Sequence, residues 1–288
     1  MRTRTIASGL AAAALLLAGQ AAPAAATAGA EPYIIGGHEA TGNTSWVAAL
    51  NYDAPAYGIT NKTTCTGTVL FRGKLVTAAH CVQNMPPQPS ASARMALISR
   101  FTVESADIPV EAKSFFVRAS KDRAAGGETA RVVRIDVHPG WQWGAGAPDK
   151  PVDDVAVLTL DHELDLQTIQ LASAPANPGD RVVTYGWGID APDGTTLPRA
   201  LQQIEHPALR PEKCSAGFIS KPETCLGNPH GTDGLCRGDS GGPSVVLVRG
   251  VPKFVGITSR GTAECGTGPD IVEAAPFYRK YLYYGRAT

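Results

Sequence analysis

The sequence carries little charge and no excess of either sign. Only 18% of its 288 residues are charged, and 26 basic side chains balance 26 acidic ones. A protein without net charge has no long-range attraction for nucleic acid or an anionic membrane surface, so neither is expected as a partner. Hydrophobic residues make up 43% of the chain, which suffices for a sizeable core and argues against disorder.

The sequence also lacks an apolar run long enough to cross a membrane, which takes about 20 residues. The run Gly9–Ala18 follows two arginines and precedes small residues at Ala26–Ala28 and Ala28–Ala30. This pattern is typical of a secretory signal peptide, here residues 1–30, and predicts a secreted, extracellular protein. A retained membrane anchor is the alternative. The alanine-rich composition suggests a bacterial source.

No Cys-x-x-Cys pair is present, which argues against a zinc site for the six cysteines. An even number of cysteines in an exported chain instead predicts three disulfides. Glycine (31 residues) and proline (22 residues) are abundant, which indicates many turns and favours a β-rich fold.

The most informative stretch, residues 235–243, reads Leu-Cys-Arg-Gly-Asp-Ser-Gly-Gly-Pro. Glycines around Ser240 let the backbone turn tightly and leave the hydroxyl uncrowded. The same turn can aim the N–H groups of Gly238 and Ser240 at one point, which suits a developing oxyanion. A glycine-rich turn with a serine can also be only a turn. The hexapeptide Gly-Asp-Ser-Gly-Gly-Pro, however, resembles the nucleophile loop of the trypsin-like (chymotrypsin-family) serine proteases.

A second motif of that family lies earlier in the chain. Two short β-type runs flank Arg72–Lys74, which predicts a hairpin. Thr77–Cys81 then reads Thr-Ala-Ala-His-Cys and resembles the family's histidine motif, which implies that His80 is the general base. The other five histidines lie outside the family's motifs and are expected to be structural.

The third motif begins with two consecutive aspartates. Residues 153–158 resemble the family's Asp-x-Ala-x-Leu strand, and the apolar run to Leu160 predicts a buried strand. The match assigns to Asp154 the role of orienting His80, and Asp153 is the rival candidate. The order His, Asp, Ser is one of several in which this triad occurs.

Ile34-Ile35-Gly36-Gly37 resembles the N-terminus that activation creates in this family. The resemblance implies that cleavage frees the amino group of Ile34, which then pairs with Asp239, since a buried carboxylate needs a partner. Residues 31–33 would form a short pro-segment, although Tyr33 is not the basic residue that precedes many activation sites. A strand entry with a Gly-Gly turn is the alternative.

The resemblance also indicates a pocket for the substrate side chain. Its floor is the residue six before the catalytic serine, here Gly234, where trypsin-type enzymes carry Asp; Asp233 lies one place too early. Asp270 falls on the expected wall segment, where glycine is usual. We therefore expect cleavage after Arg or Lys with relaxed selectivity, or, alternatively, chymotrypsin-like or broad specificity.

Residues 257–261 resemble the family's substrate-binding strand. The match makes Ser259, Arg260 and Gly261 substrate-binding residues, with Ser259 also supporting Asp154 by a hydrogen bond. Arg260 replaces the usual tryptophan. With Arg237 it is expected to add positive charge at the rim of the pocket.

The implied fold is all-β, with two six-stranded antiparallel barrels and a C-terminal helix. We expect the first barrel at residues 34–162, the second at 163–274 and the helix at 275–288, with 84–131 as a long solvated segment rather than an exosite. Tyr185–Gly188 resembles the Gly-Trp-Gly segment that opens the second barrel. The implied disulfides are Cys65–Cys81, Cys214–Cys225 and Cys236–Cys265.

The resemblance implies a serine endopeptidase that works without metal or cofactor. Protein or peptide substrates and proteinaceous inhibitors are its expected partners, and a monomer is its expected state. Two other classes remain open: an inactive family member that acts as a binding module, and an esterase for small acyl groups.

Overall fold

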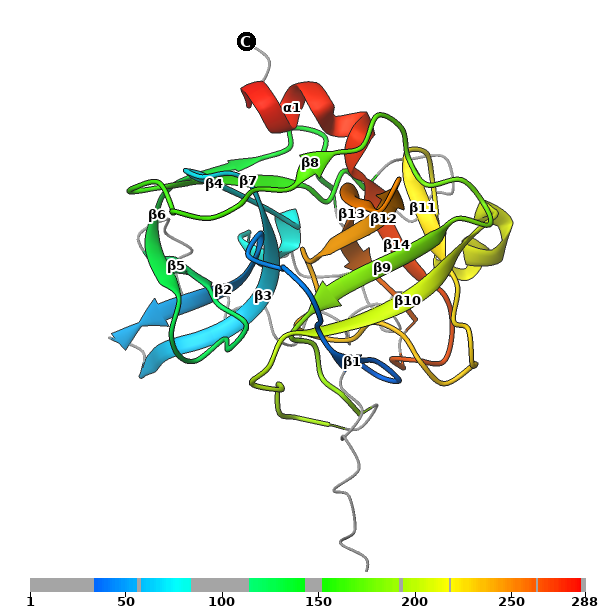
Figure 1. Cartoon of the computed structure of the whole chain (residues 1–288), viewed down its shortest axis with the longest axis horizontal. Helices are drawn as coiled ribbons and strands as arrows, with labels where there is room; N and C mark the ends of the chain where they lie inside the picture. The colour runs from blue at the N-terminus through cyan, green and yellow to red at the C-terminus, as the bar shows by residue number, and fades with distance from the viewer. Residues whose placement is uncertain are drawn as a thin grey trace, which may run out of the picture. The chain divides into compact units, whose positions relative to one another are not determined.

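The computed structural model describes residues 34–55, 58–83, 114–142, 152–191, 194–217, 219–262 and 264–285 (Figure 1). The expected signal peptide, the pro-segment 31–33 and much of the long segment 84–131 lie outside the described residues. No helix in the described part of the chain is long and apolar enough to cross a membrane.

The first barrel closes in the order β2-β3-β4-β7-β6-β5. Its strands are β2 (Val47–Ala54), β3 (Ile59–Phe71), β4 (Lys74–Thr77), β5 (Phe115–Ala119), β6 (Glu128–Val137) and β7 (Ala156–Leu160). The turn Arg72-Gly73 joins β3 to β4, as the hairpin signal predicts. Apolar side chains such as Leu50, Leu75 and Leu158 fill the interior and are fully buried, and their removal from water is the main stabilising term.

The second barrel closes through antiparallel pairs of β9 with β10, β10 with β11, β11 with β14, β14 with β13, β13 with β12 and β12 with β9. Its strands are β9 (Arg181–Gly186), β10 (Gln202–Leu209), β11 (Glu223–Leu226), β12 (Pro243–Val248), β13 (Val251–Arg260) and β14 (Asp270–Ala274). A two-residue strand, β8 (Gln170–Leu171), pairs in parallel with β13. The expected pair of six-stranded antiparallel barrels is therefore confirmed.

Short helical turns occur at η2 (Ala79–Cys81), η6 (Pro211–Gly217) and η7 (Ala275–Tyr278), and one α-helix, α1 (Arg279–Tyr284), follows η7. The C-terminal helix is confirmed, but its first turn is 3₁₀ and its described α part is shorter than the expected 275–288. All three expected disulfides, Cys65–Cys81, Cys214–Cys225 and Cys236–Cys265, are present.

The N-terminal residues of the described chain join the second barrel. Strand β1 (His38–Glu39) pairs with β10, and Ile35 forms a bridge with Gly234. We expected this segment in the first barrel. Pairing between strands that lie about 160 residues apart leaves no local signal in the sequence. The segment thus lies beside the loop that carries the serine motif.

Contacts between the barrels fix the serine loop against the first barrel. The Thr66 N–H donates to the Ser240 carbonyl at 2.9 Å, and the Thr66 hydroxyl donates to the Gly238 carbonyl at 2.9 Å. Trp46 and Tyr185 pack edge to face, with ring centroids 5.1 Å apart. Such buried bonds and aromatic contacts restrict the loop to one orientation.

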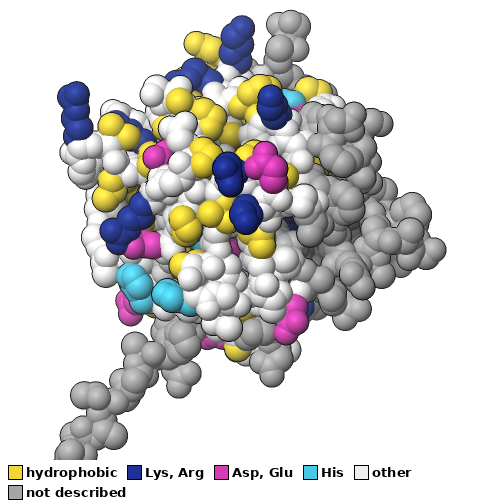
Figure 2. All heavy atoms as spheres, turned by 90° about the vertical axis from the view of Figure 1, so that its right-hand side faces the viewer, with side chains coloured by type: hydrophobic (Ala, Val, Ile, Leu, Met, Phe, Trp, Pro, Cys, Tyr) yellow, Lys and Arg dark blue, Asp and Glu magenta, His cyan; other side chains and the backbone are white. Residues whose placement is uncertain are grey.

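The surface carries both signs of charge. Figure 2 shows Lys and Arg side chains interspersed with acidic and apolar ones on the visible face. Exposed apolar side chains include Leu247, Val248 and Val251 on the β12–β13 hairpin, and Phe277 and Tyr284 near the C-terminus.

Candidate active site

His80 and Asp154 are joined by two hydrogen bonds. His80 lies in η2, and Asp154 lies two residues before β7, which pairs with β4 directly ahead of the histidine turn. The His80 main-chain N–H donates to Asp154 Oδ1 at 2.9 Å, and Nδ1 of the ring lies 2.7 Å from Oδ2. Because a carboxylate only accepts hydrogen bonds, the proton of this contact is on Nδ1. A neutral ring then has its acceptor at Nε2, the form a general base needs.

The Ser259 hydroxyl also bonds to the Asp154 carboxylate. It donates to Asp154 Oδ2 at 2.7 Å, and both residues are fully buried. The hydrogen bond expected between Ser259 and Asp154 is therefore present.

Ser240 lies in the turn just before β12 and is 5% exposed. The neighbouring N–H groups of Asp239, Gly241 and Gly242 donate to carbonyls at 2.8–3.1 Å. By contrast, the N–H groups of Gly238 and Ser240 donate to no acceptor within the described part of the chain. Gly238 has a φ of 105°, a conformation that favours glycine. Two free donors beside a serine hydroxyl can hold a negatively charged oxygen.

Asp239 folds inward, away from solvent. Its carboxylate accepts the N–H groups of Gly188 and Cys236 at 2.7 and 2.9 Å. A Cβ at Gly186 or Gly188 would lie 2.2 or 2.0 Å from its oxygens, so both glycines of the Gly-Trp-Gly segment are needed. Burial raises the pKa of Asp239 to about 7, and the two hydrogen bonds oppose the rise. No cationic side chain of the described residues lies within ion-pair distance.

Ile34 is fully buried against Ile204 and Leu235. Its φ is 45°, a left-handed conformation that is strained for a β-branched residue. Such strain costs on the order of 1–3 kcal/mol and persists only where the surroundings impose it.

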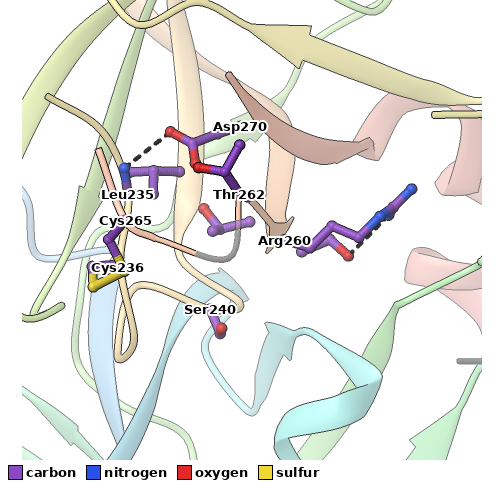
Figure 3. A pocket seen from close by; sticks show the side chains of 10 residues that line it. Leu235, Cys236, Ser240, Arg260, Thr262, Cys265 and Asp270 are labelled. Atoms are coloured by element: carbon purple, nitrogen blue, oxygen red, sulfur yellow. Dashed lines mark hydrogen bonds between the residues drawn. A yellow bond between two sulfur atoms is a disulfide. The ribbon is translucent and has the colours of Figure 1, made fainter. Parts of the chain in front are cut away.

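A pocket opens beside Ser240 (Figure 3). It is lined by Leu235, Cys236, Ser240, Thr258, Ser259, Arg260, Gly261, Thr262, Cys265 and Asp270. The lining combines the hydroxyls of Ser240, Ser259 and Thr262 with the carboxylate of Asp270.

Asp270 lies in this pocket, at the first position of β14, and Figure 3 shows Ser240 at the other end. Its Oδ2 accepts the Leu235 N–H at 2.9 Å. Burial raises the pKa of this carboxyl well above its usual range; the Leu235 bond opposes the rise, and the charges of Asp239 and Asp233 add to it. A buried carboxyl without a cation either stays neutral or binds a cation supplied by a ligand.

Gly234 does not line the pocket but leaves room for a residue that does. It is absent from the lining residues, and its N–H donates to the Ile35 carbonyl at 2.9 Å. A Cβ at this position would lie 3.0 Å from Asp270 Oδ2, so the glycine leaves room for that carboxylate. Asp233 does not reach the pocket either, because it accepts the main-chain N–H of His230 at 2.8 Å.

The expectation that Arg260 adds positive charge at the rim is wrong. Arg260 is 3% exposed, and its guanidinium points away from Asp270 (Figure 3). Both terminal nitrogens bond to the carboxylate of Glu223, with Nη2 to Oε2 at 2.8 Å. The guanidinium turns inward because the buried Glu223 offers it a bidentate partner. Arg237 is half-buried and donates to the Gly194 carbonyl at 3.2 Å.

Sequence reasoning missed a group of buried acids behind Asp154. Glu273 accepts the Asp154 main-chain N–H at 3.0 Å, and Glu223 lies opposite it in the β11–β14 register. Asp153, the rival candidate, contacts Tyr278 and lies 3.7 Å from His138 rather than beside His80. The available signal was a glutamate close to apolar residues in each of two short segments, residues 223–226 and 270–274, and a glutamate buried there must be paired or neutral.

Three potential metal-ligating side chains, Cys65, His80 and Cys81, lie within 4.8 Å of one another. The two sulfurs form a disulfide and offer no thiolate. This group therefore braces the histidine turn and is not suited to hold a metal ion.

Comparison with known proteins agrees with this geometry. The trypsin family model matches residues 34–281. The chain is 30% identical to trypsin eta of Drosophila melanogaster over 78% of each chain, and 30% identical to a trypsin of Saccharopolyspora erythraea over 68% of this chain and 75% of the relative. It is 27% identical to human mannan-binding lectin serine protease 1 over 78% of this chain and 31% of that protein.

The fold, the site and these matches define a serine protease domain. The chain belongs to the trypsin family. One of these relatives is bacterial; a bacterial source for this chain stays a prediction.

Proposed function

We propose that this protein is a secreted serine endopeptidase with Ser240, His80 and Asp154 as its catalytic triad. The observation that carries the proposal is the buried His80–Asp154 pair, with contacts of 2.7 and 2.9 Å, together with Ser240, which has two free N–H donors and lines the same pocket as Ser259, the residue that bonds Asp154. The signal-like N-terminus supports secretion, and the family supports protein or peptide substrates. A monomer and proteinaceous inhibitors belong to the same proposal.

The proposed reaction is the one that serine protease triads carry out. Ser240 Oγ attacks the scissile carbonyl while His80 Nε2 takes its proton, and Asp154 stabilises the imidazolium that forms. The N–H groups of Gly238 and Ser240 hold the oxyanion. His80 then gives the proton to the leaving amine, and water hydrolyses the acyl-enzyme on Ser240.

A cleavage-site profile on a peptide library tests this function. We expect hydrolysis of peptide bonds, mostly after Arg or Lys, with Tyr, Phe or Leu also accepted. Turnover of small esters without any peptide cleavage would instead favour the esterase alternative, and turnover of neither would favour a binding module.

Asp270→Asn should lower kcat/KM for Arg substrates at least about tenfold, which corresponds to ~1.4 kcal/mol. The amide keeps an acceptor for the Leu235 N–H but removes the charge. Aromatic substrates should be spared, so the Arg-to-Phe ratio of kcat/KM reports the pocket directly. Because the pKa of Asp270 is raised, the same ratio should increase with pH in the wild type as the carboxyl ionises.

Asp233→Asn is the matched control for the pocket, since Asp233 is also buried but contacts His230 instead. It should not lower the Arg-to-Phe ratio, because removing the Asp233 charge can only favour ionisation of Asp270. The assignment of Asp270 is wrong if both substrate types respond equally to Asp270→Asn, or if Arg substrates are never cut.

The active form should begin at Ile34. The freed amine would give the buried Asp239 the cation that the described residues do not offer. Pairing raises the pKa of that amine above its unfolded value of ~7.7–8.0. The stabilisation is then complete below that value and is lost as pH rises through the folded pKa, so activity should fall on the alkaline side.

N-terminal sequencing of the active species checks this expectation, and a start at Glu31 or earlier would refute it.

Asp239→Asn should lower kcat by on the order of 10²–10³, the cost of losing one oxyanion donor, because the loop that presents the Ser240 N–H loses its anchor.

A further inference from the structure

Behind the triad, three side-chain oxygens form a buried chain. Tyr278 Oη lies 2.9 Å from Asp153 Oδ1 and 2.7 Å from Glu273 Oε2. The other oxygen of Glu273, Oε1, accepts the main-chain N–H of Asp154 at 3.0 Å. Glu273 is fully buried on β14, and Tyr278 is 2% exposed. Glu273 thus holds the main chain of Asp154, whose side chain in turn holds His80.

The two contacts of Tyr278 fix the number of protons that these three side chains share. Both O···O distances are hydrogen-bond distances, and each bond needs one proton. The Tyr278 hydroxyl supplies only one, and an ionised carboxylate supplies none. One of the two carboxyl groups, Asp153 or Glu273, must therefore carry the second proton.

The surroundings place that proton on Glu273. The Asp153 side chain is 12% exposed, so solvent can stabilise its charge, whereas Glu273 is fully buried. Glu273 faces Asp154 and, across the β11–β14 pair, Glu223. Ionised acids on both sides disfavour a further negative charge.

The buried cation near Glu273 bonds to another glutamate, although its charge also interacts with Glu273. Arg260 on β13, the buried guanidinium of this region, bonds to Glu223 through both terminal nitrogens. Burial raises the pKa of Glu273 to about 8, with the charge of Glu223 adding to the rise, while the bonds from Tyr278 and the Asp154 N–H oppose it. Among the described residues, the other acid on β14 is Asp270, which faces the substrate pocket.

We propose that Glu273 is a protonated carboxylic acid that positions Asp154. It donates to Tyr278, Tyr278 donates to Asp153, and Oε1 fixes the Asp154 main chain without placing a second charge beside it. The positioning role depends on the proposed triad; the proton on Glu273 does not.

Glu273→Gln tests the proposal, because an amide reproduces a protonated acid: Oε1 still accepts the Asp154 N–H, and Nε2 donates to Tyr278. Glu273→Leu has a similar size and makes neither bond. Glu273→Leu should lower kcat roughly tenfold or more with KM unchanged, since small displacements of a catalytic group are costly. Glu273→Gln should restore most of the lost kcat.

Glu223→Gln is the matched control, since it alters the neighbouring glutamate that is ionised and paired. The change removes the carboxylate that both terminal nitrogens of the buried Arg260 bond, so it should lower the melting temperature strongly. Glu273→Gln should not. Equal destabilisation by the two Gln variants would mean that Glu273 is ionised, and the proposal would fail.

Two measurements on the full-length chain detect the proton on Glu273 without an activity assay. The infrared carbonyl band of a protonated carboxylic acid should be present in the wild type near neutral pH and weaker in Glu273→Gln. The raised pKa means that the folded state keeps a proton that the unfolded state loses, so wild-type stability falls as pH rises from about 4.5 to about 8. This fall should be smaller in Glu273→Gln.

An unchanged infrared band together with an unchanged pH dependence of stability would overturn the proposal. A wild type with no peptidase activity would refute the proposed function instead, and these two measurements would still decide the state of Glu273.

Discussion

Ser240→Ala is expected to lower kcat by on the order of 10⁶, the loss found when the nucleophile of a serine protease triad is removed. The Ser259 hydroxyl, which lines the same pocket, cannot replace it because it already donates to Asp154. The fold should survive, since only one oxygen is lost from a residue that is 5% exposed. The measurement is kcat on a peptide amide substrate, with a thermal melt of the same preparation.

Ser244→Ala provides the control for Ser240→Ala. Ser244 is a buried serine of the adjoining strand β12 and shares a hydrogen bond with Thr184 at 2.8 Å. Its replacement should leave catalysis intact. If a clean Ser240→Ala preparation retained more than a few per cent of wild-type activity, Ser240 would not be the nucleophile.

Asp154→Asn is expected to lower kcat by about 10⁴. The amide nitrogen would donate to Nδ1 of His80, which moves the ring proton to Nε2 and leaves no base facing Ser240. The geometry changes little, because an amide oxygen can still accept the His80 main-chain N–H that Asp154 now accepts at 2.9 Å. The measurement is kcat over a range of pH, since a tautomer defect lowers the plateau rather than only shifting the curve.

Asp153→Asn distinguishes the two consecutive aspartates. Asp153 contacts Tyr278 at 2.9 Å rather than His80, and an amide oxygen can accept the same bond. Its effect on kcat should be smaller than that of Asp154→Asn by orders of magnitude. Equal losses would show that the sequence motif has been matched to the wrong aspartate.

The barrels and the disulfides could be predicted because the family resemblance that implies them rests on short contiguous motifs. His80 and Ser240 of the proposed triad stand in such motifs, while the abundant turn residues alone indicate only a β-rich fold. Asp270 could be found because its distance from Cys265 is fixed along the chain. The burial of Asp270 could not be predicted, since it depends on packing from several strands.

The buried acids could not be predicted, because they meet only across strand pairs. Glu223, Arg260 and Glu273 lie on β11, β13 and β14, and their contact depends on the register of these three strands. In sequence, a charged residue in a strand indicates a solvated face. The expectations for Arg260 and for residues 34–40 differ from the structure because both positions depend on contacts between strands that are distant in sequence.

Active-site titration with a fluorophosphonate, followed by peptide mapping, tests the central claim most directly. The reagent reacts with a serine that a neighbouring base activates, so labelling does not depend on knowing the substrate. The account predicts one equivalent of label per active chain, located on Ser240, and its loss in Asp154→Asn. Absence of label on the chain processed at Ile34, or label on another residue, would contradict it.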